Sequence, residues 1–208
     1  MTWITTVALL IVLATSAGVG PTTRPSGPPT SPPRNSTQGQ LLVATQSLGD
    51  PRFAQTVVYM LRHDATGALG LVVNRPVATV PLARILESLG RDHDEGVGGD
   101  LRVHYGGPVE SGRGFVLHTG EWMTGESRVV QDGIAVTSDP KVFDALAHGT
   151  GPRRVLFAAG YAGWAPGQLE AEIDGGFWIV VSADEALIFD DDAASKWERA
   201  TQRRRLTL

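Results

Sequence analysis

Four polar side chains in two short motifs are the first candidates for chemistry in this chain. Asp50 and Arg52 belong to the run Asp-Pro-Arg-Phe, and Asn74 and Arg75 precede Pro76 after an apolar run. An arginine presents a planar fork of N–H donors that matches a carboxylate or a phosphate. The structural alternative, which we favour, is that Asp50 caps the next element, Arg52 pairs with a carboxylate and Pro76 takes the chain out of a sheet. Arg75 is the strongest ligand candidate, because a side chain at a strand end is held more rigidly than one in a loop.

A second candidate is the glycine-rich run 160–173, which carries Tyr161 and Trp164 between a predicted strand and a predicted helix start. Free backbone N–H groups at a helix start can receive an anion. Glu170 and Glu172, however, lie in the first helical turns, where they complement the helix dipole and repel a phosphate. We therefore favour a structural corner in which the two aromatic side chains pack and the glycines form tight turns.

Glycine and histidine supply the remaining candidate ligand groups. Gly106 and Gly107 follow His104 in the run His-Tyr-Gly-Gly-Pro, which is too short for a phosphate-binding loop and lacks its lysine. None of the five histidines has the spacing of a metal pair, although the fold can bring His104 close to His118. Asp190–Asp192 lacks the glycine and the distal glutamate of a calcium loop. The sequence predicts neither a metal nor a cofactor.

The elements that position these residues are short. Apolar, β-branched runs predict strands at 41–44, 57–61, 69–73, 103–105, 115–118, 134–137, 155–159 and 177–181. A five-residue connection, 63–67, joins the second and third of these strands, with Gly67 at positive φ. Helical spacing and glycine stops predict helices at 82–89 and 140–147, and a last helix passes through 194–197 toward a basic end.

Composition separates an N-terminal extension from one domain of ordinary size, 39–208. Residues 1–17 contain an apolar run of eight, too short to span a membrane but typical of an export signal, and residues 18–38 form a linker rich in Pro, Ser and Thr. The 25 glycines indicate a turn-rich α+β or β-rich fold. The net charge of −4 indicates that this domain binds nucleic acid poorly. Cysteine is absent, which excludes disulfides and thiolate chemistry.

Six runs, in this order, resemble the YqgE/AlgH family, also called UPF0301 or DUF179: 39–44, 50–53, 70–76, 105–109, 114–118 and 160–173. The resemblance covers residues 39–198. It implies a single α+β domain, with mixed sheets that form a small β-barrel or bifurcated sheet surrounded by short helices. It also implies a cytoplasmic protein, with export as the alternative that the N-terminus suggests. One branch of the family carries the label of a transcriptional regulator of alginate synthesis.

Two functions of different classes fit these residues. The first, which we prefer, is a non-enzymatic binding or regulatory module whose cleft near Arg75, the 106–107 glycines and 161–164 receives a protein or a small molecule. It accounts for glycine and aromatic motifs that lack a nucleophile elbow or a catalytic lysine. The second is a metal-dependent hydrolase or nucleic-acid-processing enzyme, and it requires Asp50, His63, Asp64 and Glu170 to converge around a divalent ion.

Overall fold

The computed structural model describes residues 36–94 and 96–203. The predicted export-type segment and linker up to residue 35 lie outside the described residues. The described chain comprises, in order, β1 (Gln40–Ala44), the 3₁₀ helix η1 (Pro51–Phe53), β2 (Val57–Asp64), β3 (Gly67–Val72), β4 (Pro76–Pro81), α1 (Leu82–Ser88), β5 (Asp100–Tyr105), β6 (Val109–Thr119), β7 (Arg128–Gln131), β8 (Ile134–Thr137), α2 (Lys141–Ala147), β9 (Val155–Trp164), α3 (Gln168–Asp174), β10 (Trp178–Ser182), α4 (Glu185–Phe189) and α5 (Ala193–Arg203).

The first two strands form as predicted because both of their faces bury apolar side chains. Successive side chains of a strand point to opposite faces of the sheet. In β1, Leu41 and Val43 join one core cluster, whereas Leu42 joins another on the opposite face. The same alternation continues along β2, where Tyr59 faces the first cluster and Met60 the second. A strand whose sheet is covered on both faces has a continuous apolar run in its sequence.

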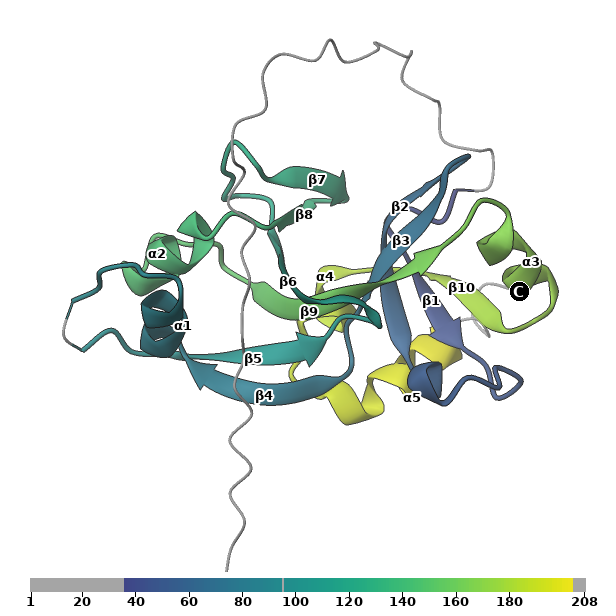
Figure 1. Cartoon of the computed structure of the whole chain (residues 1–208). Coiled ribbons are helices and arrows are strands. Elements are labelled where there is room, and N and C mark those ends of the chain that lie inside the picture. Colours follow the sequence, from purple (N-terminus) through teal and green to yellow (C-terminus); the bar gives the residue numbers. More distant parts are fainter. Residues whose placement is uncertain (1–35, 95, 204–208) are drawn as a thin grey trace, which may run out of the picture.

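The strands form one curled sheet in the order β10-β1-β2-β3-β9-β6-β8-β7, and β5 joins it through β9 with β4 on its outer side. Every pair is antiparallel except β5 with β9. Figure 1 shows the curl, with β1, β2 and β3 steeply inclined to the layer of β4 and β5. The result is a single α+β domain built around a half-barrel, which confirms the predicted fold class.

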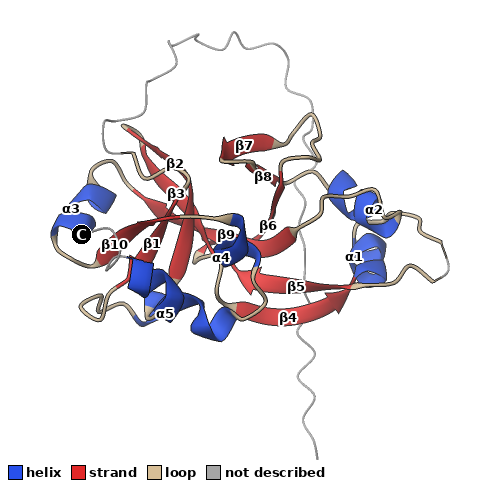
Figure 2. Cartoon of the chain, turned by 180° about the vertical axis from the view of Figure 1, so that it is seen from behind, coloured by secondary structure: helices blue, strands red, loops and turns tan. Residues whose placement is uncertain are grey.

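Helices cover the sheet on several sides. Helices α1 and α2 pack together over one end, where Leu86 and Phe143 join Phe157 of β9 in a third core cluster. Helix α3 contributes Leu169 to the cluster on the outer face of β1 to β3. Helix α4 contributes Ile188 to the first cluster, and α5 lies beside it in the view from behind (Figure 2). The predicted glycine stops are confirmed, since Gly90 and Gly149 both have positive φ.

Three expectations about local structure were wrong. The hairpin connection is two residues long, because Asp64 already pairs with Gly67, although Gly67 has the predicted positive φ. Pro76 does not end a sheet segment but begins β4, whose mostly exposed side chains gave no apolar signal. The run 160–164 is not a corner: β9 continues to Trp164, and α3 begins only at Gln168, after Gly167 as its N-cap.

Residues 36–38, predicted as linker, are already part of the packed domain. The backbone N–H of Thr37 donates to Nδ1 of His63 at 3.1 Å, and the side chain of Gln38 donates to the carbonyl of Val130 at 3.3 Å. Thr37 is buried. The ordered domain therefore begins before Gly39.

The packing of Gly107 against β9 generates a prediction. Its φ is +153°, and a Cβ at this position would lie 2.1 Å from the carbonyl carbon of Tyr161. Gly107→Ala is therefore expected to lower the free energy of unfolding by more than about 4 kcal/mol. Gly149→Ala is the matched control, because Gly149 also has positive φ but has open space around it, and it is expected to cost about 1 kcal/mol. Denaturant titration measures both, and equal costs would contradict the close packing.

Candidate functional site

Asp50 and Arg52 form a closed local unit on the loop between β1 and β2. The carboxylate of Asp50 caps η1 by accepting from the backbone N–H of Arg52 at 2.9 Å, and it pairs with the guanidinium at 2.6 Å. The hydrogen bond from the Arg52 side chain is the main reason that the pKa of Asp50 is lowered. Nη1 of Arg52 makes no hydrogen bond within the described part of the protein. The unit is thus both a cap and an exposed guanidinium edge.

Asn74 and Arg75 fasten that loop to the end of β3. The side-chain oxygen of Asn74 accepts from the N–H of Val57 at 2.8 Å, and its nitrogen donates to the carbonyl of Gln55 at 2.9 Å. Arg75 donates from Nη1 to the carbonyl of Arg52 at 2.5 Å and from Nη2 to that of Ala54 at 2.7 Å. These bonds hold the Arg75 guanidinium in one orientation. Four of the residues singled out in the sequence are therefore brought together.

Arg52 and Arg75 share an open pocket of about 500 Å³, which we call the arginine pocket. Its lining consists of Arg52, Asn74, Arg75, Pro76, Val77 and Tyr105. Tyr105 lies at the pocket because its backbone N–H donates to the carbonyl of Arg75 at 2.8 Å. This hydrogen bond brings the end of β5 beside the end of β3. A smaller cavity of about 280 Å³ shares Asn74 and Arg75 with this pocket and extends to Trp197 and Glu198 of α5. Sequence reasoning missed Tyr105 as a lining residue, because only the pairing of distant strands places it there.

Gly106 and Gly107 lie directly against the backbone of β9. The N–H of Gly106 donates to the carbonyl of Ala159 at 2.8 Å, and its own carbonyl accepts from Val72 at 2.9 Å. A Cβ on Gly106 would lie 2.2 Å from the carbonyl oxygen of Gly160. These two residues bring the chain that follows β5 directly onto β9.

Tyr161 and Trp164 are placed apart from the arginine pocket and do not contribute to its lining. The hydroxyl of Tyr161 donates to Glu110 at 3.2 Å. The indole N–H groups of Trp164 and Trp178 both donate to one carboxylate oxygen of Glu172, at 2.9 and 2.7 Å, and the two rings meet edge to face. Glu172 therefore fastens α3 to two strands, and the preferred packing role for the aromatic residues matches these contacts.

His104 of β5 is buried at 5% exposure, and its Nδ1 has no hydrogen-bond partner among the described residues. Burial, together with the nearby Lys196, lowers its pKa to about 4. Lys196 is fully buried and donates to the carbonyls of Val73 at 3.0 Å and Ile188 at 2.8 Å, and burial lowers its pKa to about 8. Sequence reasoning did not identify Lys196, although its spacing of four residues from the buried Ala200 was the available signal.

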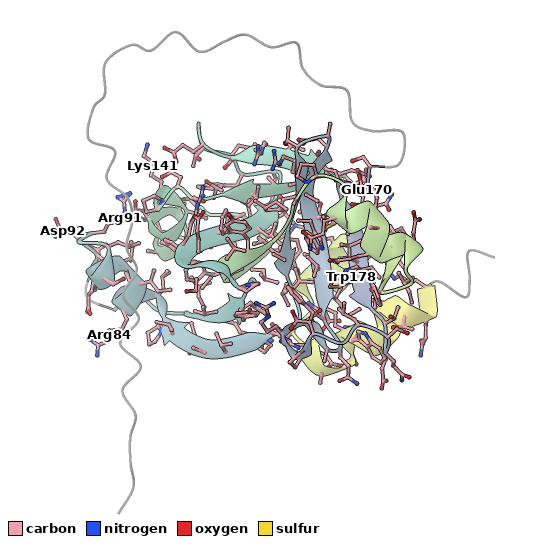
Figure 3. All side chains as sticks on the ribbon, turned by 45° about the vertical axis from the view of Figure 1, so that its right-hand side comes forward. Arg84, Arg91, Asp92, Lys141, Glu170 and Trp178 are labelled. Carbon is pink, nitrogen blue, oxygen red and sulfur yellow. The ribbon has the colours of Figure 1, made fainter. Side chains whose placement is uncertain are left out.

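The carboxylates and the histidine of the alternative, enzymatic hypothesis occupy two separate places. Nε2 of His63 lies 3.2 Å from Glu170, and Asp64 is the next residue of the same strand. Since Nδ1 of His63 accepts from the backbone N–H of Thr37, its proton is on Nε2 and points to Glu170. Figure 3 shows Glu170 on α3, on the same side of the molecule as Trp178. Asp50 lies beyond the opposite end of β2, roughly 20 Å away at about 3.3 Å per residue.

Within residues 36–94 and 96–203, no group of three or more His, Asp or Glu side chains is arranged to hold a metal ion. No helix in the same ranges is long and apolar enough to cross a membrane. Export through residues 1–17 stays a prediction, because these residues lie outside the described structure.

The sequence matches the AlgH-like family, DUF179, over residues 41–208. The chain belongs to the AlgH-like family. A UPF0301 protein from Cereibacter sphaeroides is 44% identical over 160 residues, which are 76% of this chain and 86% of that protein. A UPF0301 protein from Caulobacter vibrioides is 46% identical over 164 residues, 78% of this chain and 84% of that protein. The family resemblance of the six sequence runs is thereby confirmed.

Solved structures show the same AlgH-like fold. The solution structure of the AlgH protein from Pseudomonas aeruginosa superposes with a TM-score of 0.70 at 35% identity, covering 84% of this chain and 92% of that one. A crystal structure of a Corynebacterium diphtheriae protein has a TM-score of 0.63 at 19% identity and covers 83% of this chain and 89% of that one. At that identity the second likeness concerns the fold alone.

The buried imidazole of His104 makes the stability of this AlgH-like domain depend on pH. Its pKa is about 4 in the folded protein against an ordinary 6.5, so the unfolded chain binds the proton more readily between these values. Stability is therefore expected to fall as the pH drops from 6.5 to 4, by about 3 kcal/mol from this group. His104→Asn removes the titrating group. The unfolding free energy of the wild type minus that of the variant should therefore be about 3 kcal/mol lower at pH 4 than at pH 6.5. Denaturant curves at a series of pH values measure it, and parallel pH profiles would contradict the assignment.

Proposed function

We propose that this AlgH-like protein is a non-enzymatic binding or regulatory module whose arginine pocket receives an anionic group of a partner protein or small molecule. The observation that carries the proposal is the convergence of Arg52 and Arg75, from two different loops, on one pocket beside Tyr105. Two arginines that line one cavity are the residue type that proteins use for carboxylates and phosphates.

The charges around the pocket support an anion of low charge. Asp50 neutralises part of the charge of Arg52, so the three groups Asp50, Arg52 and Arg75 together carry a net charge of about +1. Arg75 donates to backbone carbonyls, which are neutral, so its charge is not cancelled. A carboxylate or a single phosphate group matches this balance.

The residues that line the arginine pocket favour the binding of a ligand over its chemical conversion. The lining offers guanidinium, amide and phenol groups together with apolar Pro76 and Val77, and none of its residues is an acid, a histidine, a serine or a lysine. Such a set can orient a ligand, but it supplies neither a nucleophile nor a general base near neutral pH. We therefore favour a binding module over a hydrolase.

We do not propose nucleic acid as the partner. The chain has a net charge of −4, and one pocket with two arginines neutralises too few phosphates for nonspecific binding at physiological salt. A regulatory role of the kind that the family label implies then depends on a protein or a small molecule. The proposed compartment is the cytoplasm, in keeping with the family resemblance.

A titration with acetate and, separately, with inorganic phosphate tests the pocket. Saturable shifts are expected at the backbone amide signals of Arg75, Val77 and Tyr105 in ¹⁵N-resolved NMR spectra, because these residues line it. Arg52→Gln removes one charged donor and is expected to weaken binding about tenfold.

The matched control is Arg84→Gln. Arg84 is an exposed arginine on α1 with its own carboxylate partner, Glu87, and Figure 3 shows it at the end of the molecule opposite to Trp178. The control is expected to bind both anions as the wild type does. Shifts that never saturate, or that Arg52→Gln leaves unchanged, would refute an anion site at this pocket.

A further inference from the structure

Strand β4 has an open edge that begins at the arginine pocket. It pairs with β5 on one side, and no described strand pairs with its other side. In Figures 1 and 2, seen from opposite directions, β5 lies directly above β4 and no labelled strand lies below it. The outer backbone N–H and C=O groups of such a strand are available to an additional strand.

The usable part of this edge is short and partly apolar. Pro76 and Pro81 end the strand, and proline has no N–H to offer, which confines pairing to the four residues 77–80. Within this stretch, Val77 is 64% exposed, the largest exposure among the large hydrophobic residues of the described chain. An occupant can therefore gain both backbone hydrogen bonds and apolar contact.

The arginine pocket determines the direction of the occupant. Pro76 and Val77 belong to the start of β4 and also line the pocket. A strand added antiparallel to β4 runs toward this start, so its C-terminal end arrives at Arg52 and Arg75. A parallel strand would bring its N-terminal end there, and an ammonium group would be repelled by the two guanidinium groups. Charge complementarity therefore selects the antiparallel direction and a terminal carboxylate.

We propose that the outer edge of β4 binds the C-terminal segment of a partner protein as an added antiparallel strand, with its terminal carboxylate in the arginine pocket. This inference rests on the proposed function and specifies its partner. Backbone pairing along 77–80 supplies affinity without regard to sequence, and the carboxylate fixes the register. The pocket then recognises the C-terminal end of a polypeptide and not an internal segment.

Three forms of one probe test the proposal on the full chain. The probe is a fluorescein-labelled pentapeptide, Lys-Thr-Val-Thr-Val, with a free C-terminal carboxylate, and fluorescence anisotropy measures its affinity. The same peptide with a C-terminal amide is expected to bind about tenfold more weakly, because it lacks the charged acceptor. A form N-methylated at alternate backbone nitrogens, with the carboxylate kept, is also expected to lose about tenfold, because it cannot complete the strand pairing.

Protein variants locate the site. Arg52→Gln should weaken the carboxylate form about tenfold and leave the amide form nearly unchanged, because only the former uses the guanidinium. Val77→Asp should weaken both forms by placing a charge beside the pairing edge. Arg84→Gln should leave all three affinities as in the wild type. Hydrogen exchange at the amides of 77–80 should slow when the carboxylate peptide is bound.

Each contrary result is distinguishable. Equal affinity of the carboxylate and amide forms would overturn the terminal carboxylate, and equal affinity of the N-methylated form would overturn the added strand. If acetate and phosphate bind at the arginine pocket but the peptide does not, this inference fails and the proposed function stands. If neither the small anions nor the peptide binds, both fail.

Discussion

The backbone of β9 is the constraint on which the rest of the domain depends. It is hydrogen-bonded to β6 along most of its length, to β5 near its start and to β3 near its end. The parallel partner β5 and the antiparallel partner β3 therefore end close to each other, where Val72 donates to Gly106 and Tyr105 donates to Arg75. Gly106 and Gly107 make this meeting possible, because a side chain on either would overlap the backbone of β9. The arginine pocket is a consequence of this meeting, since it lies where the ends of the two strands come together.

Buried polar groups then fix the helices relative to the strands. Lys196 joins α5 to the carbonyl of Val73, one residue before Asn74, so the helix is anchored to the strand end that carries the pocket. A buried charge costs free energy, and the hydrogen bonds from Lys196 to the carbonyls of Val73 and Ile188 offset part of this cost. Glu172 performs a comparable function for α3 by accepting from two indoles. Two buried side-chain nitrogens of the described structure remain without a partner: Nδ1 of His104 and Nε of Arg199.

Residues whose structure depends on their neighbours in sequence could be predicted, and those that depend on distant backbone could not. The buried strands β1 to β3, the helix before Gly90 and the capping role of Asp50 follow from local pattern and turn chemistry. Strand β4 was missed because its side chains are exposed and its apolar pattern is weak. The run 160–164 was misread because glycine most often marks a turn, whereas here it lets β9 accept the close approach of Gly106 and Gly107. The sequence did point to Asp50, Arg52, Asn74 and Arg75, but only the pairing of β5 with β4 and β9 shows that Tyr105 joins them.

The way in which the pocket is held also limits what it selects. Arg75 is fixed by two carbonyls and Asn74 by two backbone partners, so a ligand does not have to order these side chains and loses less conformational entropy on binding. Since Asp50 cancels part of the local charge, the net field is weak, and a free phosphate gains little from it in salt. The apolar surface of Pro76 and Val77 beside the guanidinium groups adds affinity only for a ligand that carries an apolar portion next to its anionic group. A carboxylate attached to a hydrophobic residue meets both conditions at once, and for that reason we expect the end of a polypeptide to fit this pocket better than an inorganic anion does.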